Sequence, residues 1–242
     1  HEGHVSLMRA AAAETQAPVA SIFVNPTQFA PTEDFDAYPR TWDTDSAMCA
    51  DAGIAAIYAP TASGMYPEGY ATYVTVERLT EGLCSRTRPH FFRGVATVVT
   101  KLFCAVLPDK AYFGQKDAQQ CAVITRMARD LDLGVEIVEM PIVREPDGLA
   151  MSSRNRYLGP EDRMRGLCLS RALFAAQARL QAGERDAAAI IAAVRAAMAE
   201  VDIDYIELVD AATMAPLDTV DRPILLAVAA QVPLHAAAAE HR

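Results

Sequence analysis

The stretch GVATVVTKLFCAVLPDKAYFGQKDAQQCAVITRMARDLDLGVEIVEM, residues 94–140, decides the fold class. Its pattern alternates between helix and strand, over residues 94–107, 110–113, 117–131 and 135–140. In the first helix, apolar side chains recur at the spacing of one helix face, and Pro108 ends the pattern. Short apolar strands that alternate with helices are typical of a parallel, doubly wound α/β sheet.

The same alternation extends toward the start of the chain. A helix is predicted over residues 4–15, and Pro18 separates it from a buried strand over residues 19–24. A further helix and two further strands are predicted over residues 42–52, 54–58 and 73–76. The segments between them are loops that contain Pro, Gly and Asn. We therefore expect one doubly wound, Rossmann-like sheet.

The pattern changes after about residue 147. A long Ala-rich helix begins at Pro160 and ends at Gly183. A second helix and two strands follow, over residues 186–200, 203–209 and 224–229. This order predicts a smaller C-terminal α+β domain over residues 147–242, next to a nucleotide-binding domain over residues 1–146.

Composition narrows the class of protein. The chain has 242 residues, 52% of them hydrophobic, and a formal net charge of −9, which argues against a non-specific nucleic-acid binder. No apolar run is long enough to span a bilayer. The five cysteines are scattered without CxxC spacing, so they indicate reduced thiols in the cytosol rather than disulfides or a zinc site.

Two motifs have residue types suited to phosphate. His1 and His4 lie three residues apart at a helix entrance, on one face and beside unpaired backbone N–H groups. Gly114-Gln115-Lys116-Asp117 follows a strand and precedes a helix, where a Lys can meet a phosphate. Taken singly, each has an ordinary alternative: a structural or tag-like His pair, and a strand-to-helix turn with a solvated Lys.

Two further motifs lie on loops. Met151-Ser152-Ser153-Arg154-Asn155 offers two hydroxyls and a guanidinium that could close over a triphosphate. Asn25-Pro26-Thr27-Gln28 follows a buried strand, at the sheet edge where α/β folds usually bind ligands. A common Ser-Ser-Arg loop and a plain polar turn are the alternatives.

Six segments together resemble the pantothenate synthetase family, in family order and spacing, up to about residue 160. They are HEGH, SIFVNPTQF, DAYPRT, FRGVATVVTKLF, FGQKDAQQ and IVREPDGLAMSSRNRYL. The resemblance implies a member of the nucleotidylyltransferase superfamily, with HEGH similar to its HIGH motif and MSSRN similar to its KMSKS motif. The implied reaction is the ATP-dependent ligation of pantoate and β-alanine through a pantoyl-adenylate, which releases pyrophosphate and AMP.

The resemblance also implies a set of site residues. The implied ATP contacts are His1, Glu2, Gly3, His4, Gly114, Gln115, Lys116, Asp117, Val143, Met151, Ser152, Ser153 and Arg154. Of these, the implied catalytic groups are His4, His1, Lys116 and Arg154. Gln28 would contact both pantoate and β-alanine, and Gln120 would contact pantoate. Mg²⁺ would be held by the ATP phosphates, and family members commonly form homodimers.

The chain departs from the family pattern at three places. The first strand of the sheet is expected to be missing from this sequence. Phe91 stands where the family has a His, and His90 lies one residue early. Residues 231–235 replace the family's usual last strand. These departures leave open a catalytically impaired remnant, and another nucleotidylyltransferase of the superfamily is the second alternative.

Overall fold

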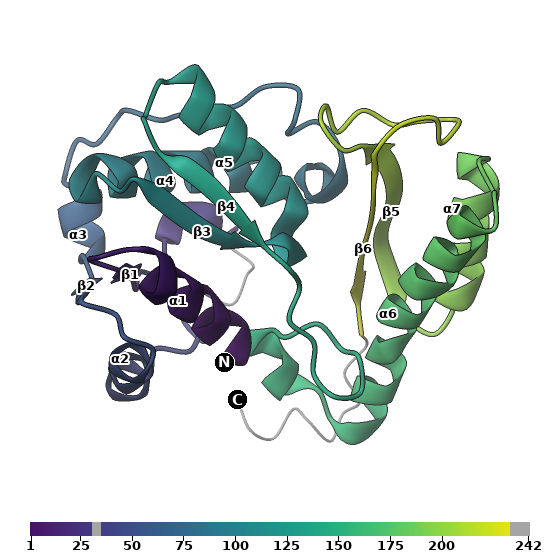
Figure 1. The fold of residues 1–242 in the computed structure, drawn as a ribbon, viewed down its shortest axis with the longest axis horizontal. Helices are drawn as coiled ribbons and strands as arrows, with labels where there is room; N and C mark the ends of the chain where they lie inside the picture. Colours follow the sequence, from purple (N-terminus) through teal and green to yellow (C-terminus); the bar gives the residue numbers. More distant parts are fainter. Residues whose placement is uncertain (31–34, 233–242) are drawn as a thin grey trace. The chain divides into compact units, whose positions relative to one another are not determined.

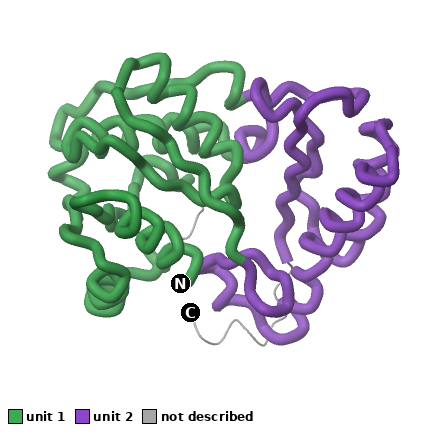
Figure 2. The backbone as a smooth tube through the Cα atoms, in the orientation of Figure 1, with its two compact units in different colours: residues 1–80, 88–143 green, residues 81–87, 144–242 purple. Residues whose placement is uncertain are grey.

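The computed structural model describes residues 1–30 and 35–232, which form two compact units. Unit 1 contains His1–Thr80 and Arg88–Val143. Unit 2 contains Glu81–Thr87 and the chain from Arg144 onward (Figure 2). The chain therefore leaves unit 1 at residue 80, returns at residue 88, and leaves it again after residue 143.

The strands of unit 1 form two parallel pairs. In the first pair, β1 (Val19–Ser21) lies beside β2 (Ala56–Tyr58). In the second, β3 (Lys110–Gly114) lies beside β4 (Glu136–Met140). Parallel pairing was the sequence prediction, but among the described residues the pairs are separate and not one continuous sheet.

The predicted strand over residues 73–76 is wrong. This segment forms no ladder with any strand in the described part of the chain. Instead, the Val74 N–H donates to the Thr97 hydroxyl at 3.0 Å. A helix side chain thus takes a backbone hydrogen bond that a neighbouring strand would have taken.

In the described part of unit 1, five α-helices lie around the strand pairs (Figure 1). They are α1 (Glu2–Glu14), α2 (Trp42–Asp51), α3 (Ala62–Met65), α4 (Phe91–Val106) and α5 (Ala118–Asp130). The predicted apolar face of α4 is buried, with Val95, Val99 and Phe103 each under a tenth exposed. Each such side chain contributes about 1.5–3 kcal/mol through burial.

Helix α1 runs antiparallel to strand β3, against which it packs. The Glu14 carboxylate, at the end of α1, accepts hydrogen bonds from Lys110 Nζ at 3.2 Å and from the Tyr112 hydroxyl at 2.9 Å. From Glu14 back to His4 the helix rises ~15 Å, and β3 advances ~13 Å over its length. The start of α1 therefore lies near the carboxyl end of β3, as Figure 1 shows.

Unit 2 follows the predicted helix-helix-strand-strand order. Helices α6 (Pro160–Gln181) and α7 (Ala187–Ala197) precede strands β5 (Asp202–Asp210) and β6 (Ile224–Gln231), which pair antiparallel. Their shared core includes Ala172, Ala176, Ile190, Val194, Met198 and Leu208. The sequence predicted a departure from the family pattern at residues 231–235. In the structure Gln231 is the last residue of β6, and residues from 233 onward lie outside the described residues.

The short segment Glu81–Thr87 belongs to unit 2 because β5 holds it. Glu207 on β5 is buried, and its Oε1 accepts a hydrogen bond from the Leu83 N–H at 3.2 Å. The same oxygen lies 3.2 Å from Arg86 Nη1. Thr87 donates from its hydroxyl to Asp204 at 3.2 Å. In the described part of the chain, no helix is long and apolar enough to cross a membrane.

Candidate active site

The two histidines of the first motif are stacked at the start of α1. The ring centroids of His1 and His4 lie 3.9 Å apart, and the planes are 17° from parallel. The side-chain Nδ1 of His1 is buried and has no hydrogen-bond partner in the described chain. Glu2 and Gly3 form the first turn of the helix, where backbone N–H groups lack partners within the helix. This helix entrance suits an anionic ligand.

The second motif lies at the carboxyl end of β3. Gly114 ends the strand, and Gln115–Asp117 form a single 3₁₀ turn (η3) that leads into α5. Lys116 is exposed, and its ammonium lies 3.3 Å from the Asp117 carboxylate. The Gly114 carbonyl accepts a contact from the buried Cys121 thiol at 3.5 Å, which fixes the turn to α5. Burial raises the pKa of Cys121 to about 12.

Electrostatics connect the two motifs. Desolvation by surrounding protein atoms is the main reason that the pKa of His4 lies below the usual value, although the residue as a whole is exposed to solvent. Positive charge, including the Lys116 ammonium, lowers the His4 pKa further, while the carboxylates of Asp45 and Asp117 oppose the shift. Because α1 is antiparallel to β3, the structure brings His4 and Lys116 into one charged neighbourhood.

Gln28 is held by a buried hydrogen-bond network that includes Asn25. Gln28 lies in a short 3₁₀ turn (η1, Pro26–Gln28), which follows β1 and is capped by Asn25. Asn25 is 3% exposed, and its Nδ2 donates to Gln28 Oε1 at 2.9 Å and to the Gly94 carbonyl at 3.2 Å. Its Oδ1 accepts from the Tyr66 hydroxyl at 2.8 Å.

Gly94 allows this turn to approach α4 closely. A Cβ atom at position 94 would lie 2.5 Å from the Thr27 carbonyl oxygen and 2.9 Å from the Gln28 nitrogen. Any side chain there would push the turn away. The absence of a side chain at Gly94, in the FRGVATVV segment, therefore allows Gln28 to take up its position.

The region around Phe91 supports the same turn. The Arg88 guanidinium lies over the Phe91 ring, 3.9 Å from its centroid, and Arg88 Nη2 donates to the Gln28 carbonyl at 3.1 Å. His90 is exposed at the N-cap of α4. Sequence reasoning did not single out Arg88, Tyr66 or the role of Asn25, and Asn-Pro, a turn-initiating pair, was the one signal available for Asn25.

Gln120 and Val143 are the remaining predicted site residues of unit 1. Gln120 is half-buried on the first turn of α5. Its neighbour Gln119 is buried and donates to the Leu79 carbonyl at 2.9 Å, which anchors this turn. Val143 is half-buried and is the last residue of unit 1.

The predicted phosphate loop, residues 151–154, lies in unit 2. Ser152 caps a 3₁₀ turn (η4, Ser153–Tyr157), since its Oγ accepts from the Arg154 N–H at 3.2 Å. Arg154 is exposed, whereas Met151, Ser152 and Ser153 are half-buried. The loop is thus a locally ordered element of unit 2.

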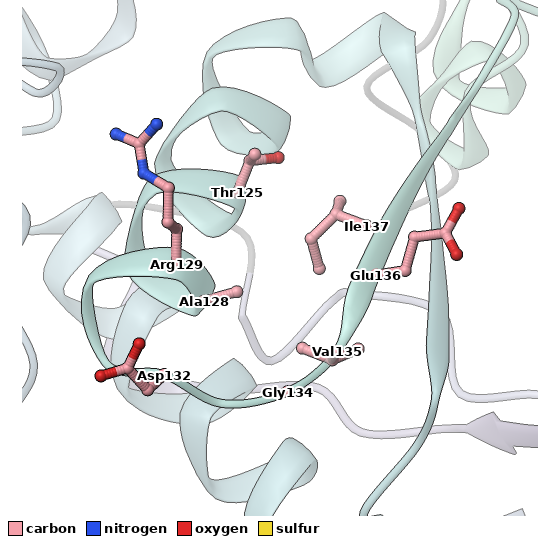
Figure 3. A pocket seen from close by; sticks show the side chains of 8 residues that line it. All are labelled: Thr125, Ala128, Arg129, Asp132, Gly134, Val135, Glu136 and Ile137. Atoms are coloured by element: carbon pink, nitrogen blue, oxygen red, sulfur yellow. The ribbon is translucent and has the colours of Figure 1, made fainter.

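A shallow groove of about 580 Å³ lies elsewhere in unit 1 (Figure 3). The residues that line it are Thr125, Ala128, Arg129, Asp132, Gly134, Val135, Glu136 and Ile137. Glu136 pairs with Lys110, so the groove is at the amino end of the β3–β4 pair. The histidine pair and Lys116 are at the other end, where parallel α/β units bind ligands.

Comparison with known proteins identifies the family. The family model described as Pantoate-beta-alanine ligase matches residues 1–237. A pantothenate synthetase from Acidobacterium capsulatum is 56% identical over 235 residues, which cover 96% of this chain and 79% of that protein. One from Moorella thermoacetica is 53% identical over 235 residues, with 96% and 83% covered.

Solved structures give the same result. A pantothenate synthetase from Thermus thermophilus superposes with a TM-score of 0.93 at 44% identity, covering 96% of this chain and 86% of that one. A pantoate-beta-alanine ligase from Francisella tularensis, complexed with beta-gamma ATP and beta-alanine, superposes with a TM-score of 0.76 at 26% identity, covering 96% and 82%. This chain therefore belongs to the pantoate-beta-alanine ligase family and is a ligase that uses ATP to join pantoate and β-alanine.

Proposed function

We propose that the reaction runs through a pantoyl-adenylate and that the stacked histidines and Lys116 bind the ATP phosphates. The observation that carries this proposal is that one charged neighbourhood contains both His4 and Lys116. The buried Nδ1 of His1, which has no partner in the described chain, supplies a further polar atom for a ligand. Such a cluster at a helix entrance suits a triphosphate.

In the first step a pantoate carboxylate oxygen attacks the α-phosphorus of ATP. A new P–O bond forms, the bond to the bridging oxygen breaks, and pyrophosphate leaves with the electron pair. Little covalent chemistry falls to the protein, so position and positive charge supply the rate. Lys116 and the histidines stabilise the charge that develops on the leaving phosphates, and His4 acts as the proton donor.

In the second step the β-alanine amine attacks the acyl carbon. The amide bond forms, AMP leaves, and the amine loses a proton to solvent or a basic side chain. Gln28 orients pantoate and β-alanine through its amide, and Gln120 contacts pantoate. Residues 151–154 form the second part of the nucleotide site, where Arg154 supplies a guanidinium. They belong to the C-terminal domain (residues 147–242), which covers the nucleotide and excludes water.

Four further features belong to this proposal. Mg²⁺ would be held by the ATP phosphates, where it would offset part of their negative charge. The two parallel strand pairs are parts of one doubly wound sheet, joined by a strand that the described residues do not contain.

The enzyme works in the cytoplasm, in keeping with five free cysteines. Finally, it forms a homodimer, which analytical ultracentrifugation would test.

Pyrophosphate exchange tests the adenylate mechanism. With ATP, Mg²⁺ and pantoate but no β-alanine, labelled pyrophosphate should enter ATP, and omission of pantoate should stop the exchange. Exchange with another acid but not with pantoate would assign a different nucleotidylyltransferase. No exchange and no AMP production by a folded protein would assign an impaired member of the family.

A further inference from the structure

A hydrogen-bond network closes the base of the loop at residues 151–154. The Asn155 side-chain Nδ2 donates to the Ala150 carbonyl at 3.0 Å. Ala150 and Asn155 flank the loop on its two sides, so this single amide joins its ends. The same Nδ2 also donates to Glu145 Oε1 at 2.8 Å, which ties the loop to the preceding turn.

That preceding turn is itself rigid. Arg144 and Ala150 form an antiparallel bridge, and the Glu145 N–H donates to the Leu149 carbonyl at 2.8 Å. Gly148 lies at the tip with φ +96°, a conformation that favours glycine. Asp147 accepts from the Leu149 N–H at 3.1 Å. The turn therefore presents the carboxylates of Glu145 and Asp147 from a fixed backbone.

Helix α6 anchors both carboxylates through one side chain. Arg163 Nε donates to Asp147 Oδ2 at 2.7 Å, and Arg163 Nη2 donates to Glu145 Oε2 at 2.7 Å. The hydrogen bonds from Arg163 and Asn155 lower the pKa of Glu145. Each Glu145 oxygen thus has a different donor: Asn155 at the loop and Arg163 on the helix.

We infer that Glu145, Asn155 and Arg163 are positioning residues, which hold Ser152, Ser153 and Arg154 in the geometry that receives the ATP phosphates. This inference rests on the proposed role of the loop in nucleotide binding. Glu145 and Arg163 are half-exposed, and short, charge-assisted hydrogen bonds join Glu145 to Arg163 and to the Asn155 amide. Such hydrogen bonds fix the geometry of the loop more than they add to global stability. A loop fixed before binding loses less conformational entropy when ATP arrives.

Asn155→Ala provides the direct test. We expect the KM for ATP to rise about tenfold, because the loop loses its closing hydrogen bonds. The KM for pantoate should stay within about twofold, since the pantoate contacts lie in unit 1. Isothermal titration of ATP, without the other substrates, should show the same weakening. An unchanged KM for ATP in a protein that still makes pantothenate would overturn the inference and leave the proposed function standing.

Asn155→Asp is a sharper second variant. The introduced carboxylate would face two acceptors, Glu145 Oε1 and the Ala150 carbonyl, so we expect a larger rise in the KM for ATP than Asn155→Ala gives. Neighbouring negative charge raises the pKa of an introduced carboxyl, and its protonated form can donate again. The defect relative to the unaltered protein should therefore shrink as pH is lowered from about 8 to about 6. A pH-independent defect would contradict the hydrogen-bond role.

Arg163 has a matched control in the same unit. Arg222 also pairs with two carboxylates, with its Nε 2.7 Å from Asp221 and its Nη1 3.9 Å from Asp210. Arg163→Ala and Arg222→Ala should have similar effects on thermal unfolding. Only Arg163→Ala should raise the KM for ATP. Arg163→Lys should raise this KM less, because lysine keeps the positive charge but cannot form the bidentate hydrogen bonds. An equal rise in both alanine variants would indicate a general structural effect and would refute the inference.

Discussion

Asn25 fixes the orientation of the Gln28 side-chain amide. The Asn25 orientation follows from two backbone groups of known type: its Oδ1 accepts from the Thr27 N–H at 3.3 Å, and its Nδ2 donates to the Gly94 carbonyl at 3.2 Å. Nδ2 must then also donate to Gln28, which accepts through Oε1. The Gln28 NH₂ group can only donate, and in the proposed function it is the group that meets the substrate.

Gln28→Glu should therefore weaken the binding of pantoate more than the binding of ATP. The new carboxylate can still accept from Asn25, but it places an oxygen where the NH₂ group was, opposite an anionic substrate. We expect the KM for pantoate to rise about 10–100-fold, which corresponds to roughly 1.4–2.8 kcal/mol, with a much smaller change in the KM for ATP. Steady-state kinetics with each substrate varied in turn would check this. An equal rise for both substrates would point to a disturbed fold and not to a lost donor.

Gly94→Ala should displace the Gln28 turn. The added methyl group would lie 2.5 Å from the Thr27 carbonyl oxygen, and overpacking of this kind costs about 1–3 kcal/mol of folding stability. The KM for pantoate should rise as well. Gly166→Ala is the control, because Gly166 is also a buried helical glycine but a Cβ there meets its nearest neighbours at 3.7 Å and 3.8 Å. Equal thermal stability of the two variants would contradict this account.

His4 should take up a proton when ATP binds. In the free protein desolvation holds the pKa of His4 below the usual histidine value, so near pH 6.5 the ring carries less of a proton than an ordinary histidine, and the negative triphosphate should raise that pKa. Titration calorimetry near pH 6.5 in buffers of different ionisation enthalpy measures the uptake. His4→Gln should reduce it, whereas His90→Gln, at the exposed N-cap of α4, should not. Identical uptake by both variants would rule out His4 as the group.

The same shift predicts how His4 affects folding. Its pKa is lower in the folded chain than in the unfolded chain, so the unfolded chain binds the proton first as pH falls. The contribution of His4 to stability is therefore complete above the ordinary histidine pKa, about 6.5. It is lost as pH falls from there through the folded value. In denaturant unfolding across this range, His4→Gln should be less sensitive to pH than the unaltered protein.

Glu207 should control the order of residues 81–87. Glu207→Ala removes the acceptor of the Leu83 N–H and should cost about 1–3 kcal/mol locally, while Glu207→Gln keeps an acceptor and should cost less. Hydrogen exchange at the Leu83 amide would report the difference. Thr87→Ala, which loses exposed hydrogen bonds to Asp204 and to the Cys84 carbonyl, is the control. Unchanged exchange at Leu83 in Glu207→Ala would show that other contacts hold the segment.

The sequence by itself determined the local elements. The apolar spacing of α4 and α5, and the short apolar runs at β3 and β4, predicted these elements within a few residues, because helix and strand periodicity depends on neighbouring positions. The same reasoning failed at residues 73–76, where the backbone hydrogen bond goes to Thr97. The histidine pair was also predicted, since side chains three residues apart on a helix share a face.

Only the tertiary structure determined which segments, distant in sequence, lie next to one another. The antiparallel packing of α1 on β3 brings His4 within electrostatic range of Lys116, and the missing Cβ of Gly94 admits the Gln28 turn. The attachment of residues 81–87 to unit 2 depends on Glu207, far along the chain. These relationships join segments distant in sequence through contacts that no local pattern encodes. Periodicity fixes which face of an element is apolar, whereas the packing of the whole unit fixes which partner that face meets.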